Sequence, residues 1–171
     1  MFDAATKILD RETIKAKVDS LRQSGKVVIF TNGCFDLLHV GHVRYLQQAR
    51  KRGDCLVVAV NSDRSVEQIK GSGRPIIPDN ERAEVLAALS CVDWVTIFDE
   101  PDPLVLIKLL RPDVLIKGAD WPEEKIIGAK EVKEAGGKVL TIPLEAGIST
   151  SDIFERIRTT SGKKIKEDPE N

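Results

Sequence analysis

The sequence predicts an α/β protein in which about five parallel strands form an open, Rossmann-like sheet flanked by helices. Three observations support this prediction. Residues 55–60 form an apolar run of strand length, and evenly apolar runs are typical of inner parallel strands covered on both faces. Segments with apolar positions at helical spacing alternate with such runs along the chain. The links between them are short, which favours right-handed crossovers within one sheet.

The elements can be placed in order along the chain. Asp10 can cap a first helix, which carries Ile14 and Val18 at helical spacing and which Gly25 ends. Glycines and prolines predict a loop at 70–78. The strands are expected at 26–31, 55–60, 94–98, 114–116 and 138–142. The later helices are expected before Gly53 and at 80–90, 104–110, 126–135 and 151–159.

Length and composition indicate a single domain. The chain has 171 residues, of which 42% are hydrophobic and 31% charged, as is ordinary for a globular protein with one core. We expect a helical segment at 1–25, the main domain at 26–159 and a polar, disordered tail at 160–171. The net charge of −1 gives no electrostatic argument for nucleic acid or an acidic membrane surface as a partner.

The cysteines and the hydrophobic runs favour a cytoplasmic protein. Cys34, Cys55 and Cys91 are odd in number and far apart, which argues against a disulfide scaffold or a thiolate zinc site. No apolar run approaches the thickness of a bilayer, and the first residues do not begin a signal peptide. We therefore expect no membrane partner.

The chain's two histidines, His39 and His42, follow the first strand through a short polar turn. A strand, a glycine-bearing turn and a helix start form the usual phosphate site of α/β sheets. Imidazoles three residues apart project from the same side of a helical turn and can donate hydrogen bonds to phosphates as charge develops. A metal site would need further ligands that the spacing does not suggest. The other candidates for binding nucleotide phosphates here are Thr31, Asn32, Gly33, Cys34, Phe35 and Gly41.

A second candidate phosphate site lies at the start of the last expected helix. Ser149, Thr150 and Ser151 offer three consecutive hydroxyls after Gly147, at the carboxyl end of a strand. Simple N-capping by serine or threonine is the alternative interpretation. The two common nucleotide motifs are absent. No stretch matches the kinase P-loop, and Gly71-Ser72-Gly73 does not open a helix as the dinucleotide-binding glycines do.

These residues resemble a known superfamily. Residues 33–42 resemble the Gly-x-Phe-Asp-x-x-His-x-Gly-His motif of the cytidylyltransferase-like nucleotidyltransferases, and residues 148–151 resemble their second motif. The similarity extends from about Val27 to Ile157. Within this superfamily, seven stretches look like the adenylyltransferase half of bifunctional ADP-heptose synthases: 61–63, 70–71, 74–75, 81–82, 92–94, 115–121 and 128–132.

The resemblance implies a reaction in which ATP and D-glycero-β-D-manno-heptose 1-phosphate give ADP-heptose and pyrophosphate, for lipopolysaccharide or surface-glycan precursors. Mg²⁺ is expected to arrive with ATP rather than in a cage of protein ligands, with Asp36 a structural hydrogen-bonding residue within the turn. The relatives' kinase domain has no counterpart in this sequence, so a separate heptose kinase and a phosphatase are expected. Relatives are commonly dimers, and a homodimer is expected here.

The resemblance also implies individual roles. His39 and His42 would bind the ATP phosphates, and Lys70, expected on a flexible loop, would reach them as a mobile clamp. Gly118, Asp120 and Trp121, at the end of the fourth strand, are candidate contacts for the nucleotide. Asn61, Asp63, Arg74 and Arg82 are candidates for binding the sugar phosphate. Arg82 could instead form a surface salt bridge with a neighbouring glutamate.

Two alternative functions stay open. The same chemistry could act on glycerol 3-phosphate with CTP, but glycerol-phosphate cytidylyltransferases carry an arginine shortly before the second motif, and residues 144–150 contain none. A non-catalytic nucleotide-binding module is the alternative of another class. The presence of both histidines, Lys70 and the serine–threonine motif argues against it.

Overall fold

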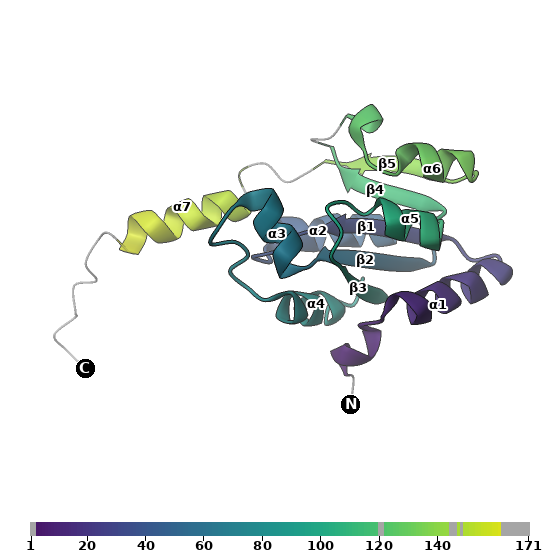
Figure 1. Cartoon of the computed structure of the whole chain (residues 1–171), viewed down its shortest axis with the longest axis horizontal. Helices are drawn as coiled ribbons and strands as arrows, with labels where there is room; N and C mark the ends of the chain where they lie inside the picture. The colour runs from purple at the N-terminus through teal and green to yellow at the C-terminus, as the bar shows by residue number, and fades with distance from the viewer. Residues whose placement is uncertain (1–2, 120–121, 144–146, 148, 162–171) are drawn as a thin grey trace.

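A parallel sheet of five strands lies between two layers of helices in the computed structural model, which describes residues 3–119, 122–143, 147 and 149–161 (Figure 1). The strand order is β3-β2-β1-β4-β5, and every neighbouring pair is parallel, which confirms the predicted fold class. The strands are β1 (Val28–Gly33), β2 (Cys55–Asn61), β3 (Trp94–Phe98), β4 (Val114–Gly118) and β5 (Lys138–Ile142).

Helices cover both faces of the sheet. The helices are α1 (Arg11–Gln23), α2 (Val40–Arg50), α3 (Asp63–Lys70), α4 (Asp79–Ala87), α5 (Leu104–Leu110), α6 (Ala129–Glu134) and α7 (Thr150–Ser161), with short 3₁₀ turns η1 (Ala4–Lys7) and η2 (Glu123–Lys125). Helices α1, α5 and α6 pack against Phe30 and its neighbours on one face. Helices α2 and α4 pack against Ile29 and its neighbours on the other face. Helix α7 lies beyond the carboxyl ends of the strands, outside both layers (Figure 1).

The N-terminal helix is part of the main core. Ile14 and Val18 of α1 are fully buried in the same cluster as Phe30. Ahead of α1, Ile8 forms a parallel bridge with Val95 at the edge of the sheet. The described part of the expected segment at 1–25 therefore packs directly on the domain that follows it.

The structure corrects several sequence-based boundaries. Residues 63–70, for which the sequence pattern predicts no helix, form α3, because Ser62 accepts a hydrogen bond from the Ser65 amide (3.1 Å) and Val66 is fully buried. Lys70 is consequently the last residue of a helix and not part of the loop. Strand β1 begins and ends two residues later than expected. Gly128, at φ 87°, separates η2 from α6 within the expected helix at 126–135.

The C-terminal helix also differs from the prediction. Helix α7 reaches residue 161, so residues 160 and 161 belong to it and not to the expected tail. The remainder of that tail, 162–171, lies outside the described residues.

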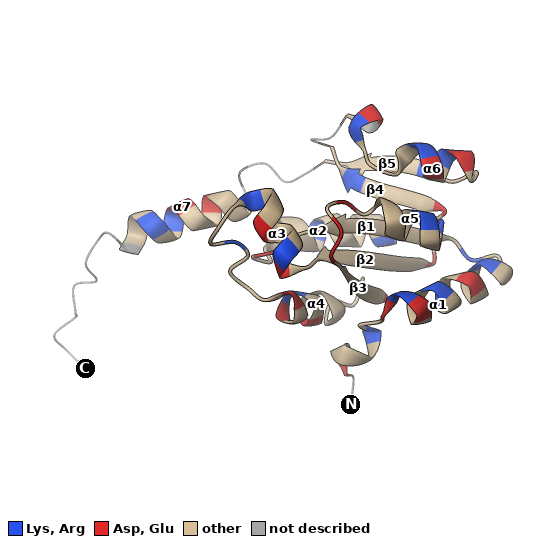
Figure 2. Ribbon diagram, viewed as in Figure 1, with Lys and Arg blue, Asp and Glu red and all other residues tan. Residues whose placement is uncertain are grey.

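Charge is concentrated on the helices and connections, and the strands are mostly uncharged (Figure 2). This distribution agrees with a sheet that is buried on both faces. Within the described part of the chain, no helix has the length and apolar character needed to span a membrane.

Strands β1 and β4 separate toward their carboxyl ends. Strand β1 pairs with β2 from Val28 to Gly33, but its pairing with β4 covers only Ile29 and Phe30. These two strands flank the topological switch point of the sheet, since the chain winds outward from them in both directions, and ligands of open α/β sheets bind at such a point.

Side chains supply partners for the backbone where the two strands separate. The Tyr45 hydroxyl donates to the Ile116 carbonyl (3.1 Å) and lies 2.8 Å from Thr31 Oγ1. The Lys117 ammonium donates to the Asn32 carbonyl (3.3 Å) and to the Asn32 side-chain oxygen. The opening at the switch point therefore leaves these carbonyls satisfied.

The buried pair of Tyr45 and Thr31 should contribute measurably to stability. We predict that Tyr45→Phe lowers the free energy of unfolding by about 1–3 kcal/mol, because the Ile116 carbonyl and the Thr31 hydroxyl lose a buried partner. Thr31→Val should lower the free energy of unfolding by less in the Tyr45→Phe variant than in the wild-type protein. Urea titration of the two single variants and the double variant tests this coupling, and strictly additive effects would contradict it.

Candidate active site

His39 and His42 form a stacked pair at the first turn of α2. Their ring centroids lie 3.8 Å apart with an interplanar angle of 22°, so the two rings are on the same side, as their three-residue spacing predicts. His39 occupies the N-cap position but makes no side-chain capping bond, so it does not occupy the amides of the first turn. The Nδ1 atoms of both rings are buried without a hydrogen-bond partner. Each ring thus brings an uncommitted polar atom to a helix N-terminus, which itself favours anions.

Burial favours the neutral form of both imidazoles by lowering their pKa values. It lowers the pKa of His42 to about 4, with a further contribution from the nearby His39, and it lowers the pKa of His39. The edge of the Phe35 ring helps to enclose His42, at a centroid distance of 5.2 Å. An anion bound against the pair would favour the charged form and reverse this shift.

The turn before the histidines is held by Asp36. Its Oδ1 atom accepts hydrogen bonds from the amides of Ile76 (2.8 Å) and Ile77 (3.2 Å). Its Oδ2 atom lies 3.0 Å from Arg74 Nη1, in an ion pair that lacks the alignment of a hydrogen bond. Asp36 is therefore a structural residue, as expected, but its partners lie in the segment before α4 and not within its own turn. The same turn contains Phe35 in a left-handed conformation (φ 47°), which is unusual for a bulky side chain.

Arg82 holds the same turn from the other side. Its guanidinium donates to the carbonyls of Ile77 (2.8 Å) and Cys34 (2.5 Å) and to the carboxylate of Asp63 (2.7 Å). The residue is only 2% exposed, so it does not form the surface salt bridge considered as an alternative. Arg82 is therefore a positioning residue for the turn. The Asp63 carboxylate is engaged by the same guanidinium.

Arg74 contacts both the turn that contains the first motif and helix α7, which the second motif begins. Besides its ion pair with Asp36, its guanidinium lies 3.9 Å from the centre of the Phe154 ring of α7. The sequence makes Arg74 a candidate for binding the sugar phosphate, and the structure shows two protein contacts for it. Phe154 was not singled out from the sequence, although Ile153, Phe154 and Ile157 show helical apolar spacing.

Three cations act electrostatically on Cys34 in this turn. Burial raises the pKa of the Cys34 thiol, and the positive charges of Lys70, Arg82 and Lys117 oppose that rise. Lys70 therefore acts electrostatically on the turn from the end of α3. The raised pKa argues against a reactive thiolate at Cys34.

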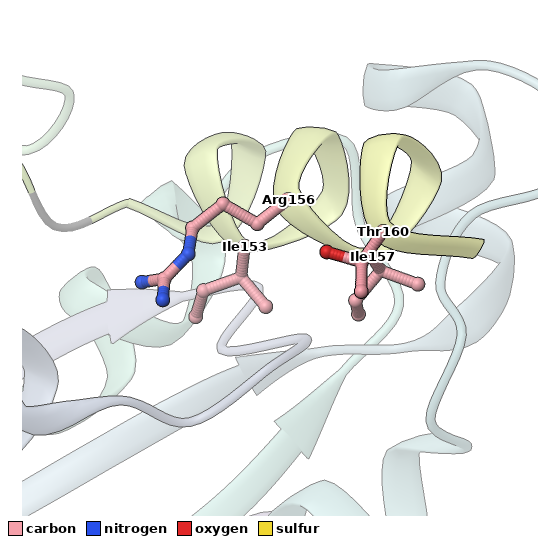
Figure 3. Close-up of a pocket in the computed structure, with 4 residues that line it drawn as sticks. All are labelled: Ile153, Arg156, Ile157 and Thr160. Carbon is pink, nitrogen blue, oxygen red and sulfur yellow. The ribbon is translucent and has the colours of Figure 1, made fainter. Parts of the chain in front are cut away.

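The second motif begins α7. Ser149 Oγ accepts from the Asp152 amide (3.1 Å) and donates to the Asp152 carboxylate (2.7 Å), so it caps this helix, as the alternative interpretation held. Thr150 and Ser151 form the first turn of α7. Farther along, Ile153, Arg156, Ile157 and Thr160 line an open pocket of about 390 Å³ beside this helix (Figure 3).

The remaining candidates differ in their placement. The side chain of Thr31 is buried against Tyr45, which leaves only its backbone for a ligand. Gly33 leaves little room for a side chain, because a Cβ would lie 3.1 Å from the Phe35 ring. Gly41 is buried in the first turn of α2, and Gly118 ends β4 beside Ile142. Asp120 and Trp121 lie outside the described residues.

Few of the described side chains near the histidine pair are available as ligands for a divalent metal. Within the described ranges, no three histidine, cysteine, aspartate or glutamate side chains come together in a way that could hold an ion. The Asp36 carboxylate is already engaged by two amides and Arg74. This arrangement is compatible with a magnesium ion bound mostly by phosphates and water.

The comparisons with known proteins agree with this geometry. Residues 30–156 match the family described as Cytidylyltransferase-like, and the chain belongs to this family. The protein is 53% identical to the bifunctional protein HldE of Syntrophotalea carbinolica over 152 residues, which are 89% of this chain and 31% of that protein. The chain thus spans about a third of this relative.

Two solved structures are similar in fold. A lipopolysaccharide core biosynthesis protein from Thermoplasma volcanium is 30% identical, with a TM-score of 0.57 over 71% of this chain and 98% of the other. A pantoate–β-alanine ligase from Francisella tularensis, solved with β,γ-ATP and β-alanine, is 14% identical, with a TM-score of 0.61 over 90% of this chain and 77% of the other. The second similarity concerns the fold alone.

The low pKa of His42 is directly measurable, because the chain has only two histidines. We predict that NMR titration without nucleotide gives His42 a pKa near 4 and that added pyrophosphate raises it. Unfolded histidine titrates near pH 6.5, so this residue should stabilise the fold above that pH and lose its contribution as pH falls toward 4. His39→Gln assigns the signals, and a His42 pKa near 6.5 in the free protein would contradict the burial argument.

Removal of Arg82 should destabilise the fold strongly. Arg82→Met leaves two carbonyls and the Asp63 carboxylate without their buried donor, and we expect a loss of about 3–5 kcal/mol. The matched control is Arg64→Met, because Arg64 is 71% exposed and pairs with Asp99 on the surface, where the cost should stay below about 1 kcal/mol. Equal losses in thermal or urea unfolding would show that Arg82 does not hold the turn.

Proposed function

We propose that this protein is an adenylyltransferase that transfers AMP from ATP to D-glycero-β-D-manno-heptose 1-phosphate, giving ADP-heptose and pyrophosphate. The observation that carries the proposal is the stacked, neutral histidine pair at the N-terminus of α2, beside the switch point of a parallel sheet. The choice of ATP and heptose phosphate rests on the resemblance to the adenylyltransferase half of ADP-heptose synthases and on the 53% identity to part of HldE.

The proposed reaction needs no general base. A phosphate oxygen of the sugar phosphate, already anionic at neutral pH, forms a bond to the α-phosphorus of ATP. The bond between the α-phosphorus and the bridging oxygen breaks, and its electron pair leaves with pyrophosphate. The protein must hold two anions in line and stabilise the charge that develops between them. Mg²⁺ bound with ATP would neutralise part of the phosphate charge.

The named residues divide these tasks. The imidazoles of His39 and His42 would donate to the phosphates of ATP, together with the first amides of α2. Lys70, at the end of α3 and next to a glycine-rich loop, would bring a positive charge to the same phosphates. Asp36 and Arg82 hold the turn that fixes these groups. The hydroxyls of Thr150 and Ser151 would complete the nucleotide site.

The finer parts of the proposal come from the family resemblance. We propose a homodimer in the cytoplasm, with heptose kinase and phosphatase activities supplying its substrate. Analytical ultracentrifugation of the purified protein would test the dimer, and sedimentation as a monomer would exclude it.

Pyrophosphate release tests the proposed reaction. We expect turnover with Mg²⁺, ATP and β-heptose 1-phosphate, and none with CTP and glycerol 3-phosphate. His42→Ala and His39→Ala should each lower kcat by about 10²–10³, the usual cost of losing one donor to a transition-state anion. The control is Lys51→Ala, at the far end of α2. Turnover with CTP and glycerol 3-phosphate would overturn the substrates, and ATP binding without turnover would indicate a non-catalytic module.

A further inference from the structure

A second pocket opens at the switch point, on the face of the sheet away from α2. It has a volume of about 270 Å³ and includes five polar or charged lining residues: Asn32, Asn61, Asp102, Lys117 and Lys125. The rest of its lining is apolar and comes from α3, from the prolines before α5 and from the isoleucines after η2. Pockets for drug-sized ligands usually measure roughly 300–1,000 Å³, so this volume suits a single sugar ring better than a whole nucleotide.

The pocket lies on the side of β1 opposite helix α2, which begins at the histidine pair. Side chains alternate between the faces of a strand. Thr31 points toward α2, where it meets Tyr45, and Asn32 points the other way and lines the pocket. The next residue is Gly33, which ends β1 between the two sites and has the Phe35 ring 3.1 Å from the position that a Cβ would take.

The polar groups of the pocket are held in place by the fold. Asn61 is 4% exposed and donates to Ser65 Oγ (2.9 Å). Asp102 Oδ1 accepts from the Leu104 amide (2.8 Å) at the start of α5, which leaves its other oxygen for a ligand. Lys117 is anchored on Asn32. Groups fixed in this way can bind a ligand without first being ordered.

Each part of the lining suits one part of a phosphorylated sugar. The apolar lining can cover the C–H face of a sugar ring, and carboxylate and amide groups can hydrogen-bond its hydroxyls. A lysine beside the phosphate turn can pair with the phosphate of the acceptor. Lys117 is the cation in that place, because its partner Asn32 precedes Gly33.

We propose that this pocket binds the acceptor, a monosaccharide phosphate, with its phosphate at Lys117 and its hydroxyls at Asp102 and Lys125. This inference rests on the proposed function, and it assigns the acceptor and the nucleotide to opposite sides of β1. Asp102 and Lys125 then determine sugar specificity, a role that no sequence motif indicated for them.

The double variant Asp102→Asn/Lys125→Gln tests the assignment. The asparagine introduced by the first substitution retains an oxygen that can cap α5, so the fold should persist. We expect the KM for heptose 1-phosphate to rise about 10-fold to 100-fold, which is the usual range for losing charged hydrogen bonds. The Kd for ATP, measured by calorimetry without acceptor, should stay within about twofold. The matched control is Asp19→Asn/Lys130→Gln, on the surfaces of α1 and α6.

The outcomes separate the two proposals. If the wild-type protein turns over and the variant weakens ATP binding instead, or changes neither constant, the pocket does not bind the acceptor. If the wild-type protein releases no pyrophosphate, the proposed function fails. In that case, calorimetry with heptose 1-phosphate and glucose 1-phosphate as probes tests separately whether the pocket binds a sugar phosphate. If the wild-type protein binds one of these sugar phosphates and the double variant does not, the assignment is supported. If the wild-type protein binds neither, the assignment is overturned.

Discussion

The early separation of β1 from β4 is the constraint on which the site depends. The two strands pair only at Ile29 and Phe30, whereas β1 continues beside β2 to Gly33. Strands that separate inside a sheet expose backbone groups, and each of these needs another partner. Tyr45 supplies one for Ile116, and Lys117 supplies one for Asn32. The opening therefore persists as a stable feature, and the ligand-binding groups gather around it.

The turn that follows β1 is held by contacts from distant parts of the chain. Asp36 binds two amides of the segment before α4, and Arg82, from α4 itself, binds the carbonyl of Cys34. These contacts keep Phe35 in its left-handed conformation and its ring against His42. A fixed turn matters for phosphoryl transfer, because donors placed in advance stabilise developing charge without further reorganisation. Burial favours the neutral form of the histidines in the protein without ligand. It also strengthens their electrostatic interaction with a bound phosphate.

The sequence predicts the features that depend on local pattern. The parallel sheet follows from apolar runs such as 55–60, and the three-residue spacing of His39 and His42 predicts that the two rings lie on the same side. Helix α3 was missed because Ser62 and its polar neighbours resemble a ligand-facing strand end as much as a helix cap. The contact of Arg82 with Cys34 joins residues 48 positions apart, and that of Lys117 with Asn32 joins residues 85 apart. A single sequence does not determine such pairs, because they depend on how the turns fold.

The two-sided arrangement around β1 fits the geometry of the proposed reaction. In-line transfer requires the attacking oxygen and the leaving pyrophosphate to lie on opposite sides of the α-phosphorus. Alternation along β1 places Thr31 on the side of α2, the helix that begins at the histidine pair, and Asn32 on the side of the pocket that Lys117 also lines. Gly33 lies between these two sides, and a Cβ there would meet the Phe35 ring at 3.1 Å. A strand end without a side chain, flanked by two sites of different chemistry, can bring the two substrates together from opposite directions.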